Sequence, residues 1–353
     1  MLKVRELVTE YHKNPIGIES KTPRLSWKLE CDRKNIVQTA YRIQCAFSET
    51  NLINNNNIVW DSGRIDSDQS IHVEYDGKEL QSGQRIYWQV KSWNNLKEES
   101  DWSEAAFWEM GLLNTTDWKA KWIEPKLEED LSKSNPCPIL RKEFKHDKAI
   151  QSARIYATAH GLYQLQLNGE KVGAEEFTPG WTAYQKRIQY QVYDVTEQVK
   201  KGNNVVGAIL GDGWYRGFFG WQGKKNHYGE KTALLMQLHL TFSDGTKETI
   251  VSDKSWKAST GAILESEIYH GEVYDARLEK RGWDKPGFDD TDWENSIEKD
   301  YGYKELVASS GSKVKVTLQV KPVEKIITPK GETVLDFGQN LVGRIRFFIK
   351  GEA

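Results

Sequence analysis

The stretch ALLMQLHLTFSDG, residues 233–245, decides the fold class of this chain. Large apolar side chains occupy every second position from Leu234 to Phe242. Alternation with a period of two places these side chains on one face of a β-strand. Asp244-Gly245 then supplies turn residues, because Gly adopts positive φ without strain and Asp bonds to its own backbone. The stretch therefore predicts a strand with one face in a hydrophobic core.

The neighbouring segments extend this pattern. Residues 205–210 are continuously apolar, which indicates a strand covered on both faces. Asn168-Gly169 predicts a tight hairpin, because both central positions of a type I′ turn need positive φ. Helical pieces are expected only at 195–200 and after 290–293. We predict that residues 118–305 form a jelly-roll, carbohydrate-binding-like β-sandwich.

The N-terminal part alternates in the same way. Trp27 shares a face with the apolar residues two positions away on either side, and so does Trp88. Turn residues such as Asp61-Ser62-Gly63 separate these segments. About seven short strands within ~110 residues predict an immunoglobulin- or fibronectin-like β-sandwich. We assign it to residues 1–113, so the predicted fold class is all-β with tandem β-sandwiches.

A third set of strands is expected near the C-terminus, at 314–320, 334–335 and 345–349. Three strands cannot bury their own apolar faces as an independent domain. We therefore interpret residues 306–353 as the first strands of a following β-sandwich that is truncated here.

Composition excludes several classes of function. A net charge of −2 without a basic stripe argues against a nucleic-acid partner. No run of ~18 apolar residues predicts a membrane span, and the N-terminus lacks an apolar signal core. Cys31, Cys45 and Cys137 are odd in number and have no metal-ligand spacing. Unpaired cysteines favour the cytoplasm over secretion.

The sequence GDGWYRGFFGW, residues 211–221, carries the first candidate site. It follows the apolar strand directly, so its rings and glycines lie in a loop at the edge of the sandwich. Rings beside a carboxylate such as Asp212 suit the apolar face and the hydroxyl groups of a pyranose. The alternative is structural: the glycines serve tight turns and the rings close the end of the sandwich.

Residues 265–277 form a second candidate, because four carboxylates lie close together there and glycosidases use a carboxylate pair. A structural ion pair between Arg277 and either Glu272 or Asp275 is the favoured interpretation.

Short motifs in a fixed order along nearly the whole chain carry a family resemblance. They are Asn14-Pro15-Ile16-Gly17-Ile18, Pro23-Arg24-Leu25-Ser26-Trp27, Trp60-Asp61-Ser62-Gly63, Tyr87-Trp88-Gln89-Val90, Trp102-Ser103-Glu104, Leu167-Asn168-Gly169, Pro179-Gly180-Trp181-Thr182, Tyr193-Asp194-Val195-Thr196, Gly211-Asp212-Gly213-Trp214-Tyr215, Gly271-Glu272-Val273-Tyr274-Asp275-Ala276-Arg277 and Asp336-Phe337-Gly338-Gln339-Asn340-Leu341-Val342-Gly343. Together they resemble the N-terminal half of bacterial α-L-rhamnosidases.

The resemblance implies a parent enzyme that hydrolyses terminal α-L-rhamnosides with a more C-terminal (α/α)₆ barrel, and a non-catalytic accessory fragment here. Rhamnose-containing glycosides and that barrel are then the expected partners. In some members the unit matching 118–305 binds rhamnose with calcium. Ala183 stands where the family often has a carboxylate, which counts against calcium without ruling it out, so we commit to no metal or other cofactor.

For the sugar-binding hypothesis the candidate contacts are Trp181, Tyr184, Asp212, Trp214, Tyr215 and Trp221. The alternative is a purely structural or protein-interacting array of sandwiches with no ligand.

Overall fold

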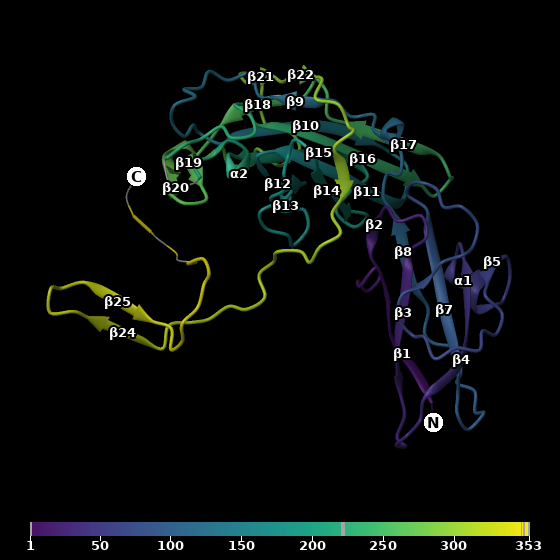
Figure 1. The fold of residues 1–353 in the computed structure, drawn as a ribbon. Helices are drawn as coiled ribbons and strands as arrows, with labels where there is room; N and C mark the ends of the chain where they lie inside the picture. The colour runs from purple at the N-terminus through teal and green to yellow at the C-terminus, as the bar shows by residue number, and fades with distance from the viewer. Residues whose placement is uncertain (1, 220–222, 347, 349, 352–353) are drawn as a thin grey trace.

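The computed structural model describes residues 2–219, 223–346, 348 and 350–351. Its described part consists almost wholly of strands, arranged as two β-sandwiches followed by an extended arm (Figure 1). The prediction of tandem β-sandwiches is confirmed. The only helical segments among the described residues are short, namely α1 (Glu49–Ile53), α2 (Gly213–Arg216), η1 (Thr115–Asp117) and η2 (Ala276–Leu278).

The first sandwich packs a three-stranded sheet, in the order β1-β3-β6, against a five-stranded sheet, β2-β8-β7-β4-β5. Its strands are β1 (Lys3–Thr9), β2 (Ile16–Ile18), β3 (Arg24–Glu30), β4 (Gln38–Ala46), β5 (Ile58–Asp61), β6 (Val73–Glu74), β7 (Arg85–Asn94) and β8 (Ala106–Met110). Trp27, Trp88 and Trp108 lie fully buried between the sheets, because alternation turns each of them inward.

The second sandwich packs a six-stranded sheet, in the order β13-β12-β15-β10-β18-β21, against a seven-stranded sheet, β22-β9-β16-β11-β14-β23, in which β17 also pairs with β16. Its strands are β9 (Trp122–Glu124), β10 (Pro138–His146), β11 (Ile150–His160), β12 (Leu162–Leu167), β13 (Glu170–Lys171), β14 (Ile188–Asp194), β15 (Gly202–Gly211), β16 (Ala233–Phe242), β17 (Lys247–Val251), β18 (Lys257–Thr260), β21 (Glu294–Asn295), β22 (Ile297–Lys299) and β23 (Leu306–Ala308). A separate hairpin joins β19 (Ile263–Glu267) to β20 (Gly271–Tyr274).

The core of the second sandwich lies between its two sheets. The alternating apolar residues of β16, from Leu234 to Phe242, face those of β15 and β10 across this layer. Gly207, on the outer face of β15, lies under the ring of Trp283, so that strand is covered on both faces as predicted. Asn168 and Gly169 have φ of 55° and 86°, which confirms the predicted hairpin between β12 and β13.

Three local predictions differ from the structure. A turn at 196–198 stands in place of the helix predicted at 195–200, and the strands β21 and β22 stand in place of the one predicted after 290–293. The strand predicted at 314–320 is wrong, because only Lys315 forms a bridge there, to Glu175. Alternation alone does not make a strand when no continuous partner lies beside it. The stretch 345–349 contains no strand among its described residues, and positions 347 and 349 lie outside them.

The two sandwiches share a polar contact at their junction. The hydroxyl of Tyr190 in β14 accepts a hydrogen bond from the backbone N–H of Leu112 at 2.9 Å and donates one to Glu19 at 2.9 Å. The buried carboxylate of Glu109 in β8 binds Arg154 in β11 at 2.7 Å. These bonds connect the end of the first sandwich to the seven-stranded sheet of the second.

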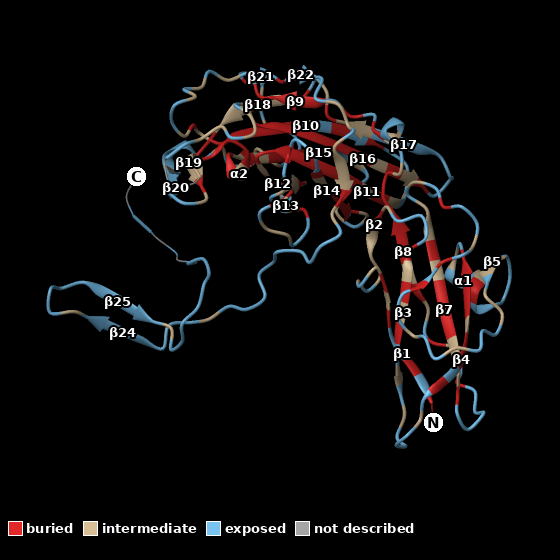
Figure 2. Ribbon diagram, in the orientation of Figure 1, coloured by how far each residue is buried: buried red, intermediate tan, exposed pale blue. Residues whose placement is uncertain are grey.

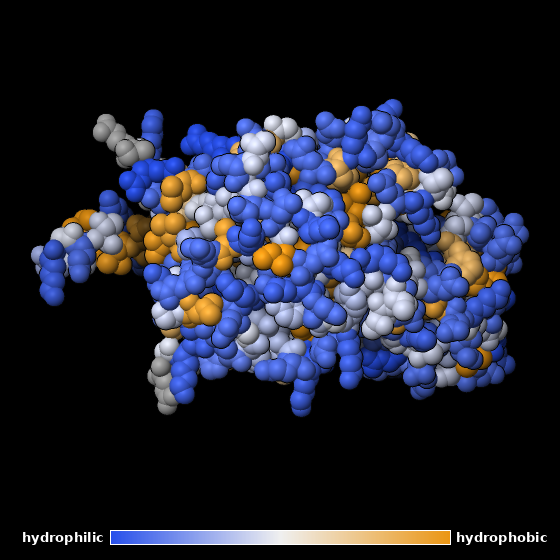
Figure 3. All heavy atoms as spheres, turned by 90° about the horizontal axis from the view of Figure 1, so that it is seen from above, coloured by the Kyte–Doolittle hydropathy of each residue, from blue (hydrophilic) through white to orange (hydrophobic). Residues whose placement is uncertain are grey.

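Residues after β23 leave the second sandwich as an arm that carries the hairpin of β24 (Glu324–Ile327) and β25 (Thr333–Asp336). Every residue of these two strands is exposed (Figure 2). Apolar side chains on this projecting hairpin interrupt a surface that is otherwise mostly hydrophilic in Figure 3. Across the described residues, no helix is long and apolar enough to cross a membrane.

The junction yields a first prediction. Tyr190→Phe removes the hydroxyl that serves both Leu112 and Glu19, so the buried N–H of Leu112 and the half-buried carboxylate of Glu19 each lose a partner. We expect the free energy of unfolding to fall by about 1–3 kcal/mol, as measured by denaturant titration. Tyr269→Phe is the matched control, because Tyr269 is exposed at the tip of the β19–β20 hairpin. Equal stability of the two variants would show that the junction bonds contribute nothing.

Candidate functional site

The loop that follows β15 begins with the single turn α2 and returns to β16 at Ala233. Gly213 opens this turn with φ of 53°, and a Cβ atom there would lie 2.5 Å from Leu162. A residue with a side chain would therefore be strained and would clash at this position. The turn places Trp214 toward the surface and turns Tyr215 and Arg216 inward.

Four rings from two loops form a surface that we call the aromatic platform: Phe177, Trp181, Trp214 and Phe219. The indole rings of Trp181 and Trp214 are nearly parallel, with an angle of 7° between them and centroids 5.9 Å apart. Phe219 meets Trp181 edge-on at 5.5 Å, and Phe177 lies 6.0 Å from Trp214. Trp181 is 51% exposed, so the platform presents an apolar face to solvent.

A second layer of rings lies beneath the platform and is buried. Tyr215 stacks on His160 with centroids 4.5 Å apart, and His160 stacks in turn on Trp122 at 4.3 Å. Tyr184 packs edge-on against Tyr215 at 5.4 Å and donates a hydrogen bond to the backbone of the 177–181 turn. This layer ties the platform to the interior of the sandwich.

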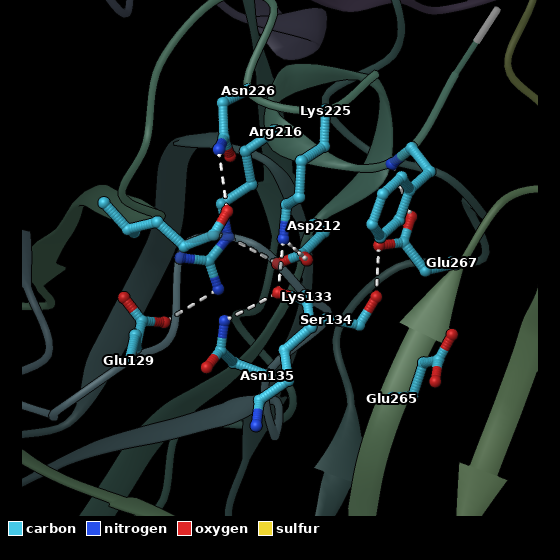
Figure 4. A network of polar contacts seen from close by, with 12 residues as sticks. Glu129, Lys133, Ser134, Asn135, Asp212, Arg216, Lys225, Asn226, Glu265 and Glu267 are labelled. Carbon is cyan, nitrogen blue, oxygen red and sulfur yellow. Dashed lines mark hydrogen bonds and ion pairs between the residues drawn. The ribbon is translucent and has the colours of Figure 1, made fainter. Parts of the chain in front are cut away.

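A buried polar network holds the other side of the loop (Figure 4). The guanidinium of Arg216, which is 1% exposed, binds Asp212 at 2.5 Å and Glu129 at 2.8 Å. Glu129 also binds Lys231 at 2.7 Å, and Lys225 approaches Asp212 at 3.9 Å. Positive and negative side chains thus alternate through the network, so that each buried charge has a partner of opposite sign.

Glu267 of β19 binds the same loop at Phe218. One carboxylate oxygen accepts the backbone N–H of Phe218 at 3.0 Å, and the other accepts the hydroxyl of Ser134 at 2.6 Å. Asn226 donates to the carbonyl of Leu131 at 3.0 Å. The loop that carries Trp214 and Phe219 is therefore held against residues 129–135 at several of its described residues (Figure 4).

The two carboxylates of this region titrate differently. Burial raises the pKa of Glu129, but its bonds to Arg216 and Lys231 outweigh burial and leave the pKa below its ordinary value. Burial raises the pKa of Glu267, and the hydrogen bond from Ser134 offsets this only in part. Glu129 therefore favours the folded state when ionised, whereas ionisation of Glu267 disfavours it.

The predicted contact residues fall into three groups. Trp181 and Trp214 belong to the exposed platform. Tyr184, Asp212 and Tyr215 are buried beneath it, within the ring layer and the polar network. Trp221 lies outside the described residues.

Sequence reasoning missed three residues that build this region. Arg216 follows Asp212 at the i,i+4 spacing of a helical ion pair, which is a signal that could have been used. Glu129 comes from a charged loop far away in the sequence, and His160 from the end of β11. No local pattern indicates these long-range contacts.

The second predicted stretch forms the β19–β20 hairpin and η2. Asp275 binds Arg277 at 2.6 Å, which confirms the predicted structural ion pair. The carboxylate of Glu265 lies 3.6 Å from the ring of His270. Within the described residues, no three His, Cys, Asp or Glu side chains are grouped so that they could hold a metal ion.

The ring layer predicts a pH dependence of stability. Burial lowers the pKa of His160 to about 4 from its ordinary value of 6.5. The unfolded chain therefore binds a proton that the folded chain does not, so stability is lost as the pH falls from 6.5 toward 4, by about 3 kcal/mol from this group. His160→Phe should flatten the curve of unfolding free energy against pH in this range. A slope as steep as that of the exposed control His270→Phe would contradict it.

The polar network predicts a cost for removing one charge. Asp212→Asn leaves Arg216 buried with one anion fewer, and we expect a loss of about 3 kcal/mol in the free energy of unfolding. Asp66→Asn, which breaks an exposed pair with Arg64, should cost less than about 1 kcal/mol. A chemical denaturation series compares the two, and a similar small cost for both would mean that the network does not anchor the loop.

Models of two domain families match this chain in succession. Residues 4–114 match the Rha78A-like N-terminal immunoglobulin domain. Residues 148–318 match the α-L-rhamnosidase N-terminal domain. The first match coincides with the first sandwich, and the second covers most of the second sandwich and the start of the arm.

Curated relatives extend the match. An α-L-rhamnosidase from Formosa agariphila is 39% identical over 350 residues, which is 95% of this chain and 37% of the relative. One from Alteromonas sp. is 37% identical over 353 residues, again 95% of this chain and 37% of the relative. The chain thus spans a little over a third of these relatives.

Solved structures agree with the sequence matches. The crystal structure of an α-L-rhamnosidase from Aspergillus terreus superposes with a TM-score of 0.91 at 37% identity, covering 97% of this chain and 39% of that one. The structure of the Streptomyces avermitilis α-L-rhamnosidase complexed with L-rhamnose gives 0.90 at 26% identity, over 97% and 49%. The chain therefore belongs to the α-L-rhamnosidase family and corresponds to the N-terminal region of its members.

Proposed function

We propose that this chain is a non-catalytic accessory region of an α-L-rhamnosidase and that its aromatic platform binds rhamnose-containing glycosides. The succession of the two N-terminal domain matches supports the accessory role. The observation that carries the binding proposal is the nearly parallel pair of the exposed Trp181 and the half-buried Trp214. A flat apolar surface of this kind suits the C–H face of a pyranose ring.

Polar groups beside the platform suit the sugar hydroxyls. The hydroxyl of Tyr228 accepts a hydrogen bond from the indole N–H of Trp181 at 3.3 Å and remains able to donate. The exposed ring of His227 packs against Phe219 with centroids 4.1 Å apart. In this proposal Trp181 and Trp214 contact the sugar, while the buried candidates Tyr184, Asp212 and Tyr215 hold these rings in place.

The arm supports a further part of the proposal, that residues from 306 onward begin a following sandwich and lead toward the catalytic barrel of the whole enzyme. Its hairpin exposes apolar side chains on strands with no other partner among the described residues. Lys313 binds Glu175 at 2.5 Å and Arg344 binds Glu176 at 3.1 Å. These pairs hold the arm beside the loop that carries Phe177.

The alternative function is a structural or protein-interacting array of sandwiches without a ligand. The exposed apolar hairpin favours it, since such surfaces commonly bind other protein surfaces. As to localisation, the cysteines support the cytoplasm over secretion. Cys31, Cys45 and Cys137 form no disulfide in the structure, and cytosolic proteins keep their thiols reduced.

Calorimetric titration with L-rhamnose tests the platform. We expect saturable binding that weakens about tenfold, or about 1.4 kcal/mol, in Trp181→Ala and in Trp214→Ala. Trp93→Ala is the matched control, because Trp93 is a half-buried indole in β7 of the first sandwich. It should leave the affinity unchanged.

Two outcomes would contradict the binding proposal. One is no heat of binding up to ~10 mM rhamnose, which corresponds to a binding free energy weaker than about −3 kcal/mol. The other is an affinity that both platform variants retain in full. Either result would favour the structural alternative.

A further inference from the structure

A cavity of about 250 Å³ lies on the outer face of the six-stranded sheet, away from the platform residues. Its floor consists of Ile139 of β10 and Ile209 of β15, which are paired across the two strands. Their neighbours Leu140 and Leu210 face the core of the sandwich, so alternation turns both isoleucines outward. Ile263 and the ring of Trp283 complete the apolar walls.

Two glycines keep this space open. A Cβ atom on Gly207 would lie 2.4 Å from the ring of Trp283, so the indole lies directly against the backbone of β15. A Cβ atom on Gly261 would lie 2.6 Å from the terminal methyl of Ile139. Because neither residue carries a side chain, the ring can lie flat on the sheet and the isoleucine can keep its place.

The wall that carries Trp283 is fixed from below by Arg141. This guanidinium is 1% exposed and donates to the backbone carbonyl of Trp283 at 2.8 Å. It also binds the carboxylates of Glu143, at 2.6 Å, and Asp290. A buried cation with three fixed partners does not shift easily, so the cavity is formed before any ligand enters.

The chemistry of the lining restricts what fits. Burial raises the pKa of the Cys137 thiol to about 12, so it lines the cavity as a neutral group. Charged side chains stand at the rim, where Glu279 accepts bonds from the Tyr274 hydroxyl at 2.7 Å and from Arg281 at 3.2 Å. The hydroxyls of a pyranose would lose their water against the isoleucines without gaining partners, which is costly. An aromatic ring has no such groups on its faces.

We propose that this cavity binds a single aromatic ring with one polar substituent, such as a phenol, with the ring between Trp283 and the isoleucines and the substituent at the charged rim. The volume is below the range of sites for drug-sized ligands and suits one six-membered ring. A phenolic ring can arrive as a free phenol or as the aglycone of an aryl glycoside. This site does not depend on the sugar platform.

NMR of the chain with ¹³C-labelled isoleucine methyl groups tests the proposal, with phenol and phenyl α-L-rhamnoside as separate probes. We expect saturable shifts of the methyl signals of Ile139, Ile209 and Ile263 with phenol. The same shifts with the glycoside assign the site to an aglycone, and shifts with phenol alone assign it to free phenols. L-Rhamnose should leave these three signals unchanged.

Variants of the cavity and of the aromatic platform keep the test decisive. Trp283→Ala removes one wall and Gly261→Val fills the space, so each should weaken phenol binding at least tenfold. Trp214→Ala should leave phenol binding unchanged, while Trp283→Ala should leave rhamnose binding unchanged, which separates failure of this site from failure of the platform. No shift of the three signals up to ~10 mM phenol, or equal affinity in both cavity variants, would overturn the proposal.

Discussion

The structure depends above all on the packing of the two sheets of the second sandwich against each other. The inward side chains of β11 and β16 meet those of β10 and β15 in one continuous hydrophobic layer. Burying such side chains contributes about 1.5–3 kcal/mol each, which fixes the strands in register. Every other feature is attached to this layer: the loop at the end of β15, the ring layer behind it, the cavity outside the six-stranded sheet and the first sandwich.

The seven-stranded sheet buries both of its faces. One face belongs to the core, and the other carries Trp122 of β9 and Tyr156 of β11, which cluster with Trp118 from the connection after the first sandwich. The stack from Trp122 through His160 to Tyr215 then extends this second layer to the base of the aromatic platform. The loop that carries Trp214 and Phe219 is thus held by the interior on one side and by the buried Arg216 network on the other. Rings held in this way suit ligand binding better than mobile ones.

Much of this could be predicted from local patterns. The alternation from Leu234 to Phe242 predicted a core strand, because its period matches the pleat of a sheet. Asn168-Gly169 predicted its hairpin because few other residue pairs tolerate two positive φ angles. What could not be predicted depends on distant partners. The sequence indicates a ligand contact at Asp212, whereas the structure pairs this carboxylate with Arg216. Arg216 also binds the buried carboxylate of Glu129, which is far away in the sequence and therefore leaves no local signal. The apolar alternation at 314–320 failed because a strand also needs a neighbour.

We propose that this region assists an α-L-rhamnosidase without performing its hydrolysis. The most direct measurement is the release of 4-nitrophenol from 4-nitrophenyl α-L-rhamnoside by the purified chain, followed by absorbance over a range of protein concentrations. We expect a rate equal to that of the buffer at every concentration. A rate that rises in proportion to the concentration of the chain, and that persists after repeated purification, would contradict it.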